Sequence, residues 1–404
     1  MKICVAGKND IACNVLRKIL NEKTLDIDVC VAINKDDTGV NTWQESLMFV
    51  AGNLGVKVLS LERLYEIKDL LFVSVEFDQI IKPQKFLSNR LYNIHFSLLP
   101  RHRGVSTAIW PILEGDSKAG VTFHEIDEGI DTGDIVEQYR FTIPEDYNSR
   151  DLYFRFMEEG EKLVIKNVFS MIASLDKPHA QPQTQSNASC HYRKDIDFQN
   201  TEKFIEWTAS GVSRYLRAFN FHEYQLPLIQ GLRVSNFRVT NQRGNKKAGE
   251  LTQSNFHTYL LATKDFDVEI KIDPYCSLYD WCIGKCDLPK GFDFNEVFNI
   301  NWCDENGWNP LMIAAYHGNL RAIKTLVKKG ADINVTNKRG TSPLMYTRSA
   351  PSLKEGKECF VYLLSLGASW QSCDVKGKDI ESYLQNDNQE ELLNILNQHR
   401  SQTN

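Results

Sequence analysis

Short apolar runs alternate with helix-like segments over about the first 100 residues, and this alternation limits the possible folds more than any other feature of the chain. The apolar runs are Lys2–Ala6, Val29–Ile33, Val56–Leu59 and Leu71–Val75, and the helix-like segments are Ile11–Asn21, Trp43–Asn53 and Leu61–Leu70. Strands and helices that alternate at this spacing predict a parallel, doubly wound sheet with right-handed crossovers. The turn at residues 7–10 has one glycine and no G-x-G-x-x-G, so the usual dinucleotide-binding loop is not predicted.

The length and composition indicate a multidomain globular protein. At 404 residues the chain is too long for one ordinary hydrophobic core, so we expect two or three domains. The net charge of −5 argues weakly against a general nucleic-acid-binding surface. No apolar run approaches the roughly 20 residues that span a bilayer, and the first run is too short for a secretory signal. We therefore expect a cytoplasmic protein without a membrane segment.

The ten cysteines are scattered along the chain, which favours reduced thiols over a disulfide framework. Their one cluster is Cys276, Cys282 and Cys286. It lacks the C-x2-C knuckle of zinc sites and has no histidine close by in sequence. We therefore predict no bound metal.

Residues 93–104, N-I-H-F-S-L-L-P-R-H-R-G, place an amide, an imidazole and a hydroxyl within five positions, ahead of a loop with proline and glycine. If residues 93–96 are extended, Asn93 and His95 face the same side of the strand. An amide can stabilise a developing oxyanion, and an imidazole can take up a proton near neutral pH. Taken alone, however, the pattern is better explained by a core histidine and a turn asparagine.

Residues 120–136, G-V-T-F-H-E-I-D-E-G-I-D-T-G-D-I-V, predict a strand, an acidic loop and a second strand. Solvated turns often contain acidic residues beside glycine, and this explains Asp127, Glu128 and Asp134 equally well. Asp131 differs because it lies close to the apolar start of the second strand. A carboxylate there could accept a hydrogen bond from a neighbouring imidazole, raise its pKa and fix its orientation.

Together, these two stretches resemble the signature of formyltetrahydrofolate-dependent formyltransferases, which use an asparagine, a histidine and an aspartate. Asn93, His95 and Asp131 match this triad, and Asp131 follows His95 by 36 positions. The chain resembles methionyl-tRNA and glycinamide ribonucleotide formyltransferases over about residues 1–185, and it looks closer to the sugar N-formyltransferases that act on dTDP-linked amino sugars. The resemblance implies a Rossmann-like, mostly parallel α/β catalytic domain over 1–185. In it, Asn93 stabilises the oxyanion, His95 takes the amine proton, and Asp131 orients the imidazole or relays the proton.

The resemblance also implies where the formyl donor, N10-formyltetrahydrofolate, binds. In the family, backbone groups of the loop at residues 125–131 and the strand end near Phe77 hold the pterin. Ile80, Leu99 and Ile126 would supply apolar walls, although plain core packing explains them as well. The residues assigned to this site are Phe77, Asp78, Ile80, Leu99, Ile126, Asp127 and Glu128.

The next segment is predicted to be a helix followed by a smaller domain. Apolar spacing predicts an amphipathic helix over Ser149–Leu175, which closes the first domain or makes a dimer contact. After a polar, proline-containing linker we expect an α+β domain over 186–295, with a helix at Thr201–Phe219 and a small antiparallel β unit at 228–275. Basic residues suit a diphosphate and aromatic ones a pyrimidine base, although a basic surface and an aromatic core explain each residue equally well. The proposed substrate-binding residues are Lys82, Arg103, Arg193, Lys194, Arg217, Phe221 and Tyr224.

The last third of the chain is a repeat. Similar sequence motifs begin at Gly307 and Gly340, and their separation of 33 residues is the ankyrin period. A third repeat follows an insertion near 350–358. We predict an α-helical ankyrin module over 296–404 that packs on the catalytic part. Ankyrin modules usually bind proteins, but Trp302 and Trp308 could instead form a surface for a second nucleotide-sugar, or be buried.

The resemblance implies an enzyme that moves the formyl group of N10-formyltetrahydrofolate to the amine of a dTDP-linked amino-dideoxyhexose, for O-antigen or other surface polysaccharide. By analogy within the family, the added ankyrin region favours a dTDP-3-amino-3,6-dideoxyhexose of the glucose or galactose series as the substrate. The alternatives are a dTDP-4-amino-4,6-dideoxyglucose N-formyltransferase, a methionyl-tRNA formyltransferase, and an ankyrin scaffold with an inactive folate-binding domain. A homodimer is the family expectation. We expect no nucleic-acid or membrane partner.

Overall fold

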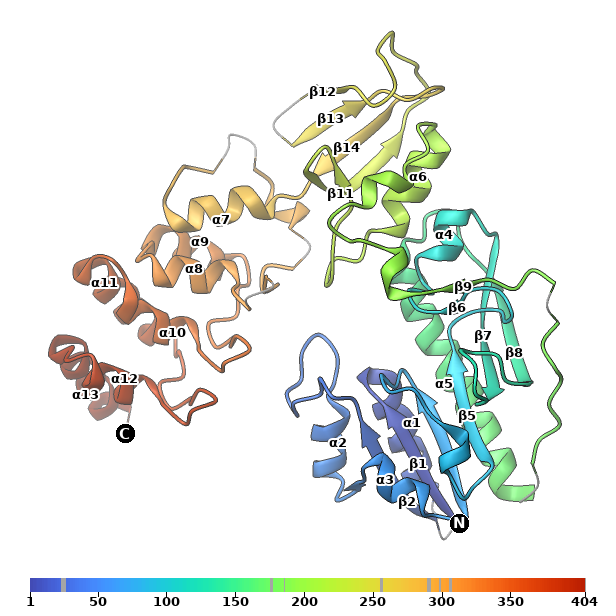
Figure 1. The fold of residues 1–404 in the computed structure, drawn as a ribbon. Coiled ribbons are helices and arrows are strands. Elements are labelled where there is room, and N and C mark those ends of the chain that lie inside the picture. Colours follow the sequence, from blue (N-terminus) through green and yellow to red (C-terminus); the bar gives the residue numbers. More distant parts are fainter. Residues whose placement is uncertain are drawn as a thin grey trace. The chain divides into compact units, whose positions relative to one another are not determined.

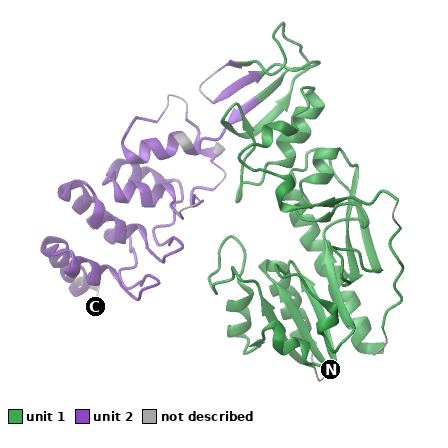
Figure 2. Ribbon diagram, in the orientation of Figure 1, with its two compact units in different colours: residues 1–251, 261–269 green, residues 252–260, 270–404 purple. Residues whose placement is uncertain are grey.

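The computed structural model describes residues 1–22, 27–174, 177–184, 186–254, 257–288, 292–297, 299–304 and 307–403. The chain forms two compact units, which Figure 2 distinguishes by colour. Unit 1 consists of residues 1–251 and 261–269, and unit 2 consists of residues 252–260 and 270–404.

A seven-stranded sheet organises unit 1 (Figure 1), and its strand order is β3-β2-β1-β4-β5-β7-β8. Strands β1 to β5 are parallel, whereas β7 and β8 are antiparallel to their neighbours. The mostly parallel, doubly wound sheet is therefore confirmed. The strands are β1 (Lys2–Gly7), β2 (Asp28–Ile33), β3 (Lys57–Val58), β4 (Leu70–Val75), β5 (Arg90–His95), β7 (Lys118–Glu125) and β8 (Ile135–Thr142).

Helices pack closely on this sheet. Helices α1 (Asn9–Asn21) and α5 (Ser149–Ser174) contact each other, and α5 also contacts β5. Gly160 of α5 makes this approach possible, because a Cβ there would lie 3.2 Å from Phe96 and 3.3 Å from Ile11. The predicted helix at Ser149–Leu175 is thus confirmed up to residue 174. The other helices of this region are α2 (Leu47–Asn53), α3 (Leu61–Tyr65), η1 (Pro83–Lys85) and α4 (Trp110–Glu114).

The predicted helix over Thr201–Phe219 is wrong in its extent. The chain forms a short 3-10 helix, η3 (Thr201–Phe204), and then a separate helix, α6 (Ala209–Ala218). The break occurs because Thr208 caps α6, its side chain accepting a hydrogen bond from the Gly211 N–H. A two-residue strand, β6 (Arg103–Gly104), pairs with β9 (Cys190–His191), and η2 (Arg193–Asp195) follows.

The small β unit expected over 228–275 is present as a five-stranded sheet of order β10-β11-β14-β13-β12. The boundary between the two units falls within this sheet. Its strands are β10 (Leu228–Ile229), β11 (Leu232–Val239), β12 (Leu251–Gln253), β13 (Thr258–Leu261) and β14 (Val268–Ile272).

Unit 2 is mainly a stack of helix pairs that restart at Pro310, Pro343 and Ile380, as the repeat predicts. Polar side chains cap helices α8 to α12; for example, the Asn309 side chain accepts a hydrogen bond from the Met312 N–H. Helix α7, which precedes the repeats, buries Trp281 in the same apolar core. The helices are α7 (Tyr275–Ile283), η4 (Phe294–Glu296), α8 (Pro310–Tyr316), α9 (Leu320–Lys328), α10 (Pro343–Tyr346), η5 (Thr347–Ser349), α11 (Leu353–Ser365), α12 (Ile380–Asn386) and α13 (Glu390–Thr403).

No helix in the described part of the chain combines the length and the apolar character that a bilayer span requires.

Candidate active site

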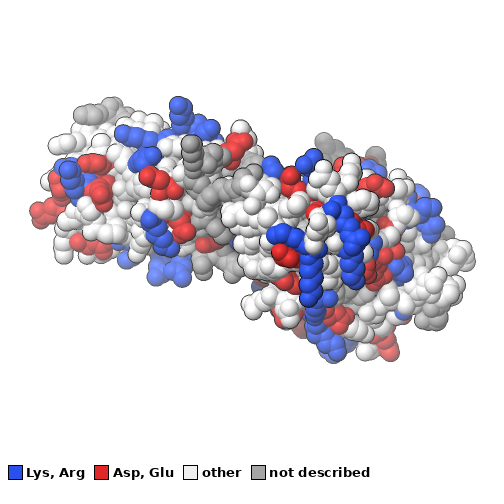
Figure 3. Space-filling view, turned by 90° about the horizontal axis from the view of Figure 1, so that it is seen from above, with Lys and Arg blue, Asp and Glu red and all other residues white. Residues whose placement is uncertain are grey.

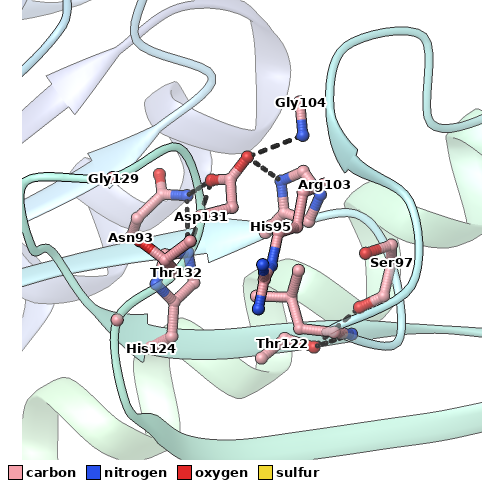
Figure 4. A network of polar contacts seen from close by, with 12 residues as sticks. Asn93, His95, Ser97, Arg103, Gly104, Thr122, His124, Gly129, Asp131 and Thr132 are labelled. Carbon is pink, nitrogen blue, oxygen red and sulfur yellow. Dashed lines mark hydrogen bonds and ion pairs between the residues drawn. The ribbon is translucent and has the colours of Figure 1, made fainter. Parts of the chain in front are cut away.

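The sheet brings the predicted triad together at the carboxyl end of β5 (Figure 4). Asn93 and His95 are two positions apart on this strand, and both side chains point toward Asp131. Asp131 comes from the loop between β7 and β8 and has a left-handed backbone, with φ of 51°. Ligands of doubly wound sheets bind at this edge, so the triad lies where the fold places its sites.

The imidazole of His95 is buried and has a defined tautomer. Its Nε2–H donates to the His102 carbonyl oxygen at 2.8 Å, because a carbonyl can only accept. Nδ1 therefore carries the lone pair, and it lies 3.5 Å from Asp131 Oδ2. Burial lowers the pKa of His95 below its usual value, although the Asp131 carboxylate opposes this effect. His95 is thus a neutral base whose accepting nitrogen faces a carboxylate.

Asp131 is held as a carboxylate. Its Oδ2 accepts a hydrogen bond from the Gly104 N–H at 2.9 Å. Burial raises the pKa of Asp131, but the neighbouring His95 and His124 and the Gly104 N–H together bring it well below the ordinary value. An anion at this position can stabilise a positive charge that forms on His95.

Asn93 is oriented by His124, a residue that the sequence did not single out. The two residues face each other in the antiparallel pairing of β5 with β7. His124 Nδ1–H donates to the Glu125 carbonyl at 2.7 Å, so its Nε2 accepts from the Asn93 amide at 3.1 Å. The second amide hydrogen faces Asp131 Oδ1 at 3.4 Å, a long contact that a better acceptor can replace.

Gln183 is a second residue that sequence reasoning missed. Its amide nitrogen donates to the carbonyls of Asp131 and Gly133, each at 2.8 Å. Its oxygen accepts from Arg103 at 2.6 Å. Arg103 is buried and paired within the site, so the alternative of a basic surface does not apply to this residue. No sequence signal indicates Gln183, because it acts from the segment predicted to be a linker.

The apolar residues predicted to bind folate lie in different environments. Phe77 and Ile126 are partly buried against one apolar cluster of the sheet. Leu99 is buried at 4% exposure, whereas Ile80 is 80% exposed. Phe77 also lines a half-open cavity of about 280 Å³ beside the ends of β2 and β3. Their contact with folate stays a prediction.

The acidic residues predicted for the same site are engaged in local contacts. Asp78 accepts a hydrogen bond from the Lys35 N–H at 3.0 Å. Asp127 accepts one from the Thr132 hydroxyl at 2.7 Å, which folds the loop back on itself. Glu128 is exposed. The contact of these residues with folate stays a prediction.

The residues predicted to bind the nucleotide-sugar differ in burial. Arg217 is half-buried and donates to the Tyr147 carbonyl at 3.1 Å, and Phe221 is 5% exposed. Besides the buried Arg103, the others lie at the surface, and their role stays a prediction: Lys82, Arg193, Lys194 and Tyr224.

One group in the described residues could offer three ligand atoms to a metal, namely His102, Glu114 and His191. Arg101 already forms ion pairs with Glu114 and Asp116, each at 2.7 Å. The cluster is therefore satisfied as an ion-pair network, and we assign no metal to it. The side chain of Cys276 lies outside the described residues.

Two family profiles match the chain: the formyl transferase profile at residues 61–168 and a profile of three ankyrin repeats at residues 285–378. WlaRD, a sugar 3N-formyl transferase solved with dTDP and 5-N-formyl-THF, is 37% identical over 67% of this chain and 97% of its own, with a TM-score of 0.61. The N-formyltransferase from Helicobacter canadensis, solved with folinic acid and dTDP-3-aminofucose, is 39% identical over 68% of this chain and 100% of its own, also with a TM-score of 0.61.

Curated relatives are more distant. The methionyl-tRNA formyltransferases of Francisella philomiragia and Nitrosomonas eutropha are 29% and 28% identical, over 52% and 42% of this chain. The chain spans 67% and 53% of the lengths of these two relatives.

The chain belongs to the formyltransferase family, and it is a formyl-transferring enzyme with ankyrin repeats in its C-terminal region. Within that family, about two thirds of the chain are similar to N-formyltransferases, one of which is described as a sugar 3N-formyl transferase.

Proposed function

We propose that the protein transfers the formyl group of N10-formyltetrahydrofolate to the amine of a dTDP-3-amino-3,6-dideoxyhexose. The observation that carries this proposal is the arrangement of Asn93, His95 and Asp131. A neutral imidazole with its free nitrogen 3.5 Å from a carboxylate, beside an oriented amide, suits acyl transfer to an amine.

In the proposed reaction, the neutral amine attacks the formyl carbon, and a carbon–nitrogen bond forms. The carbonyl oxygen gains negative charge, and Asn93 donates to it with the hydrogen that otherwise makes the 3.4 Å contact with Asp131. His95 Nδ1 takes a proton from the attacking nitrogen, and the imidazolium is stabilised by Asp131. The bond from the carbon to N10 then breaks, and the proton passes to N10, which leaves tetrahydrofolate and the N-formyl sugar.

The choice of a 3-amino sugar is supported by the two similar structures, because one is described as a 3N-formyl transferase and the other was solved with dTDP-3-aminofucose. A 4-amino sugar remains the alternative substrate of the same chemistry. The product would serve surface polysaccharide synthesis, including O-antigen.

The curated relatives favour a second candidate, methionyl-tRNA as the acceptor. Such an enzyme needs a basic surface for the RNA backbone. The net charge of this chain is −5, and on the face shown in Figure 3 Lys and Arg lie among Asp and Glu. These charges support the sugar over the tRNA.

The test is to incubate the full chain with N10-formyltetrahydrofolate and a panel of acceptors: dTDP-3-amino sugars, dTDP-4-amino sugars and methionyl-tRNA. Mass spectrometry would follow the gain of one formyl group. We expect product with a 3-amino sugar, and none with His95→Asn as the matched control. Product only with tRNA would replace the proposed substrate, and no product with any acceptor would favour the inactive scaffold.

We propose that the ankyrin repeats bind a protein or a second nucleotide-sugar. Trp302 lies against Tyr275 with ring centroids 5.1 Å apart, and Trp308 lies against Tyr346 at 4.3 Å. Both tryptophans are partly buried within unit 2. Calorimetric titration of the full chain with dTDP would reveal a second site, and Trp308→Ala should remove that site alone. We also propose a homodimer, which sedimentation would test.

A further inference from the structure

Glu76 follows β4 directly and lies beside the catalytic strand. Val75 pairs with Ile94 in the parallel register, so Glu76 comes at the level of His95. Its backbone is left-handed, with φ of 57°, and its carbonyl accepts a hydrogen bond from the Asn34 side chain at 3.0 Å. A non-glycine residue in this conformation is strained, and such residues cluster at functional sites.

Among the described residues, only one oxygen of the Glu76 carboxylate accepts hydrogen bonds. Oε2 accepts from the Asn9 amide at 2.9 Å and from the Tyr153 hydroxyl at 2.8 Å. No residue in the described part of the chain donates to Oε1. Burial raises the pKa of Glu76, although its two donors oppose this. A partly buried carboxylate whose Oε1 has no donor among the described residues can accept a hydrogen bond from a ligand.

The surroundings of Glu76 connect it to the predicted nucleotide-binding aromatics. The Tyr153 ring lies 5.5 Å from Phe221, and Phe221 lies 4.8 Å from Tyr224. Trp43 completes the cluster at 5.4 Å from Tyr224. If the pyrimidine of the substrate contacts these rings and its amine lies at His95, the hexose between them would lie beside Glu76.

We propose that Glu76 Oε1 accepts a hydrogen bond from a sugar hydroxyl next to the reacting amine, so that Glu76 determines which hexoses are accepted. This inference rests on the proposed function. The donor is a hydroxyl rather than the amine, because a carboxylate would hold the amine as an ammonium ion without a lone pair for attack. Asn9 and Tyr153 then act as positioning residues, since they hold Oε2 and direct Oε1 at the ligand.

The first experiment measures steady-state kinetics of Glu76→Gln. We expect the KM for the dTDP-amino sugar to rise about 10- to 100-fold, as for loss of a hydrogen bond to a charged group, while the KM for the formyl donor changes less than about 2-fold. Glu66→Gln, the same change at an exposed glutamate just after α3, is the matched control and should leave the KM for the sugar unchanged. An unchanged sugar KM in a folded Glu76→Gln protein would overturn the inference.

The second experiment starts with wild-type protein alone, so its first result does not depend on how the variant folds. Wild-type protein is assayed with dTDP-3-amino sugars that lack the C2 or the C4 hydroxyl. With one analogue, the wild-type kcat/KM should fall about as much as the Glu76→Gln substitution lowers it for the parent sugar. Replacing the parent sugar with that analogue should lower the kcat/KM of Glu76→Gln much less. Equal rates with both analogues and the parent sugar would refute the inference but leave the proposed function intact. Failure of wild type with every amino sugar would refute both.

Discussion

Replacing Asp131 with asparagine tests the electrostatic core of the mechanism. The side chain keeps its shape, and its oxygen can still accept the Gly104 N–H that Oδ2 accepts at 2.9 Å. The change therefore removes the negative charge that lies 3.5 Å from His95 Nδ1 while preserving the hydrogen bond.

The size of the effect follows from this separation. Two unit charges 3.5 Å apart attract by about 5 kcal/mol at an effective dielectric constant of about 20, which is an upper limit. Observed shifts from one opposite charge at such distances are about 1–3 pKa units, or about 1.4–4 kcal/mol. Burial already lowers the pKa of His95, and Asp131 opposes this, so Asp131→Asn should lower that pKa further by about 1–3 units.

The sign can be checked directly. His95 acts as a base, so kcat/KM should fall as the pH falls through the pKa of His95. In wild type this fall should occur below the usual histidine pKa, and in Asp131→Asn it should occur at a still lower pH. NMR titration of ¹³C-labelled histidines in the free enzyme would give the pKa, with the His95 signal assigned by its absence in His95→Asn. Because the imidazolium loses its partner, turnover should also drop by about 10- to 1000-fold.

Asp134→Asn is the matched control, since Asp134 lies in the same loop and no hydrogen bond or ion pair joins its carboxylate to His95. It should leave the pKa of His95 within about 0.3 units. A pKa that stays the same or rises in Asp131→Asn would refute the reasoning.

Three other substitutions test the support of the site and of the repeats. Gly104→Ala would place a Cβ 2.1 Å from a carbonyl oxygen at φ of +89°, and should lower the thermal midpoint and turnover; Gly231→Ala, with φ of +79° in open space, is the control and should cost clearly less. Gln183→Ala leaves a buried guanidinium without its acceptor, so turnover should fall about 10-fold, and wild-type rates would contradict the role of Gln183. Leu363→Ala, at a fully buried site, should cost about 2–5 kcal/mol of unfolding free energy in urea. Leu366→Ala, 41% exposed, should cost less than about 1 kcal/mol, and equal costs would contradict this packing.

Local patterns predicted the fold well because strands and helices are periodic over a few residues. The alternation over the first 100 or so residues predicts the parallel sheet, and the two-residue spacing of Asn93 and His95 predicts their common direction. The 33-residue period likewise predicts the helix pairs. These features need no knowledge of distant contacts.

The parts that sequence reasoning missed depend on such contacts. His124 orients Asn93 only through the register of two antiparallel strands 31 positions apart in the chain. Gln183 reaches the 131–133 loop across about 50 positions, from a segment that looks like a linker. The helix at Thr201–Phe219 was predicted without its break, because a threonine within a helical pattern does not reveal that it caps a new helix.

The backbone at the active edge of the sheet is itself informative. Eight non-glycine residues among those described have a positive φ, and four of them are Asn9, Glu76, His102 and Asp131. Glu76 and Asp131 each supply a carboxylate. The His102 carbonyl fixes the His95 tautomer, and the Asn9 amide donates to Glu76. Each such residue costs of order 1–3 kcal/mol, so folding alone would favour glycine at these positions. The side chains of Asp131, Glu76 and Asn9 make the contacts that glycine would lose, and this explains why the strain is retained at the edge where the formyl group would be transferred.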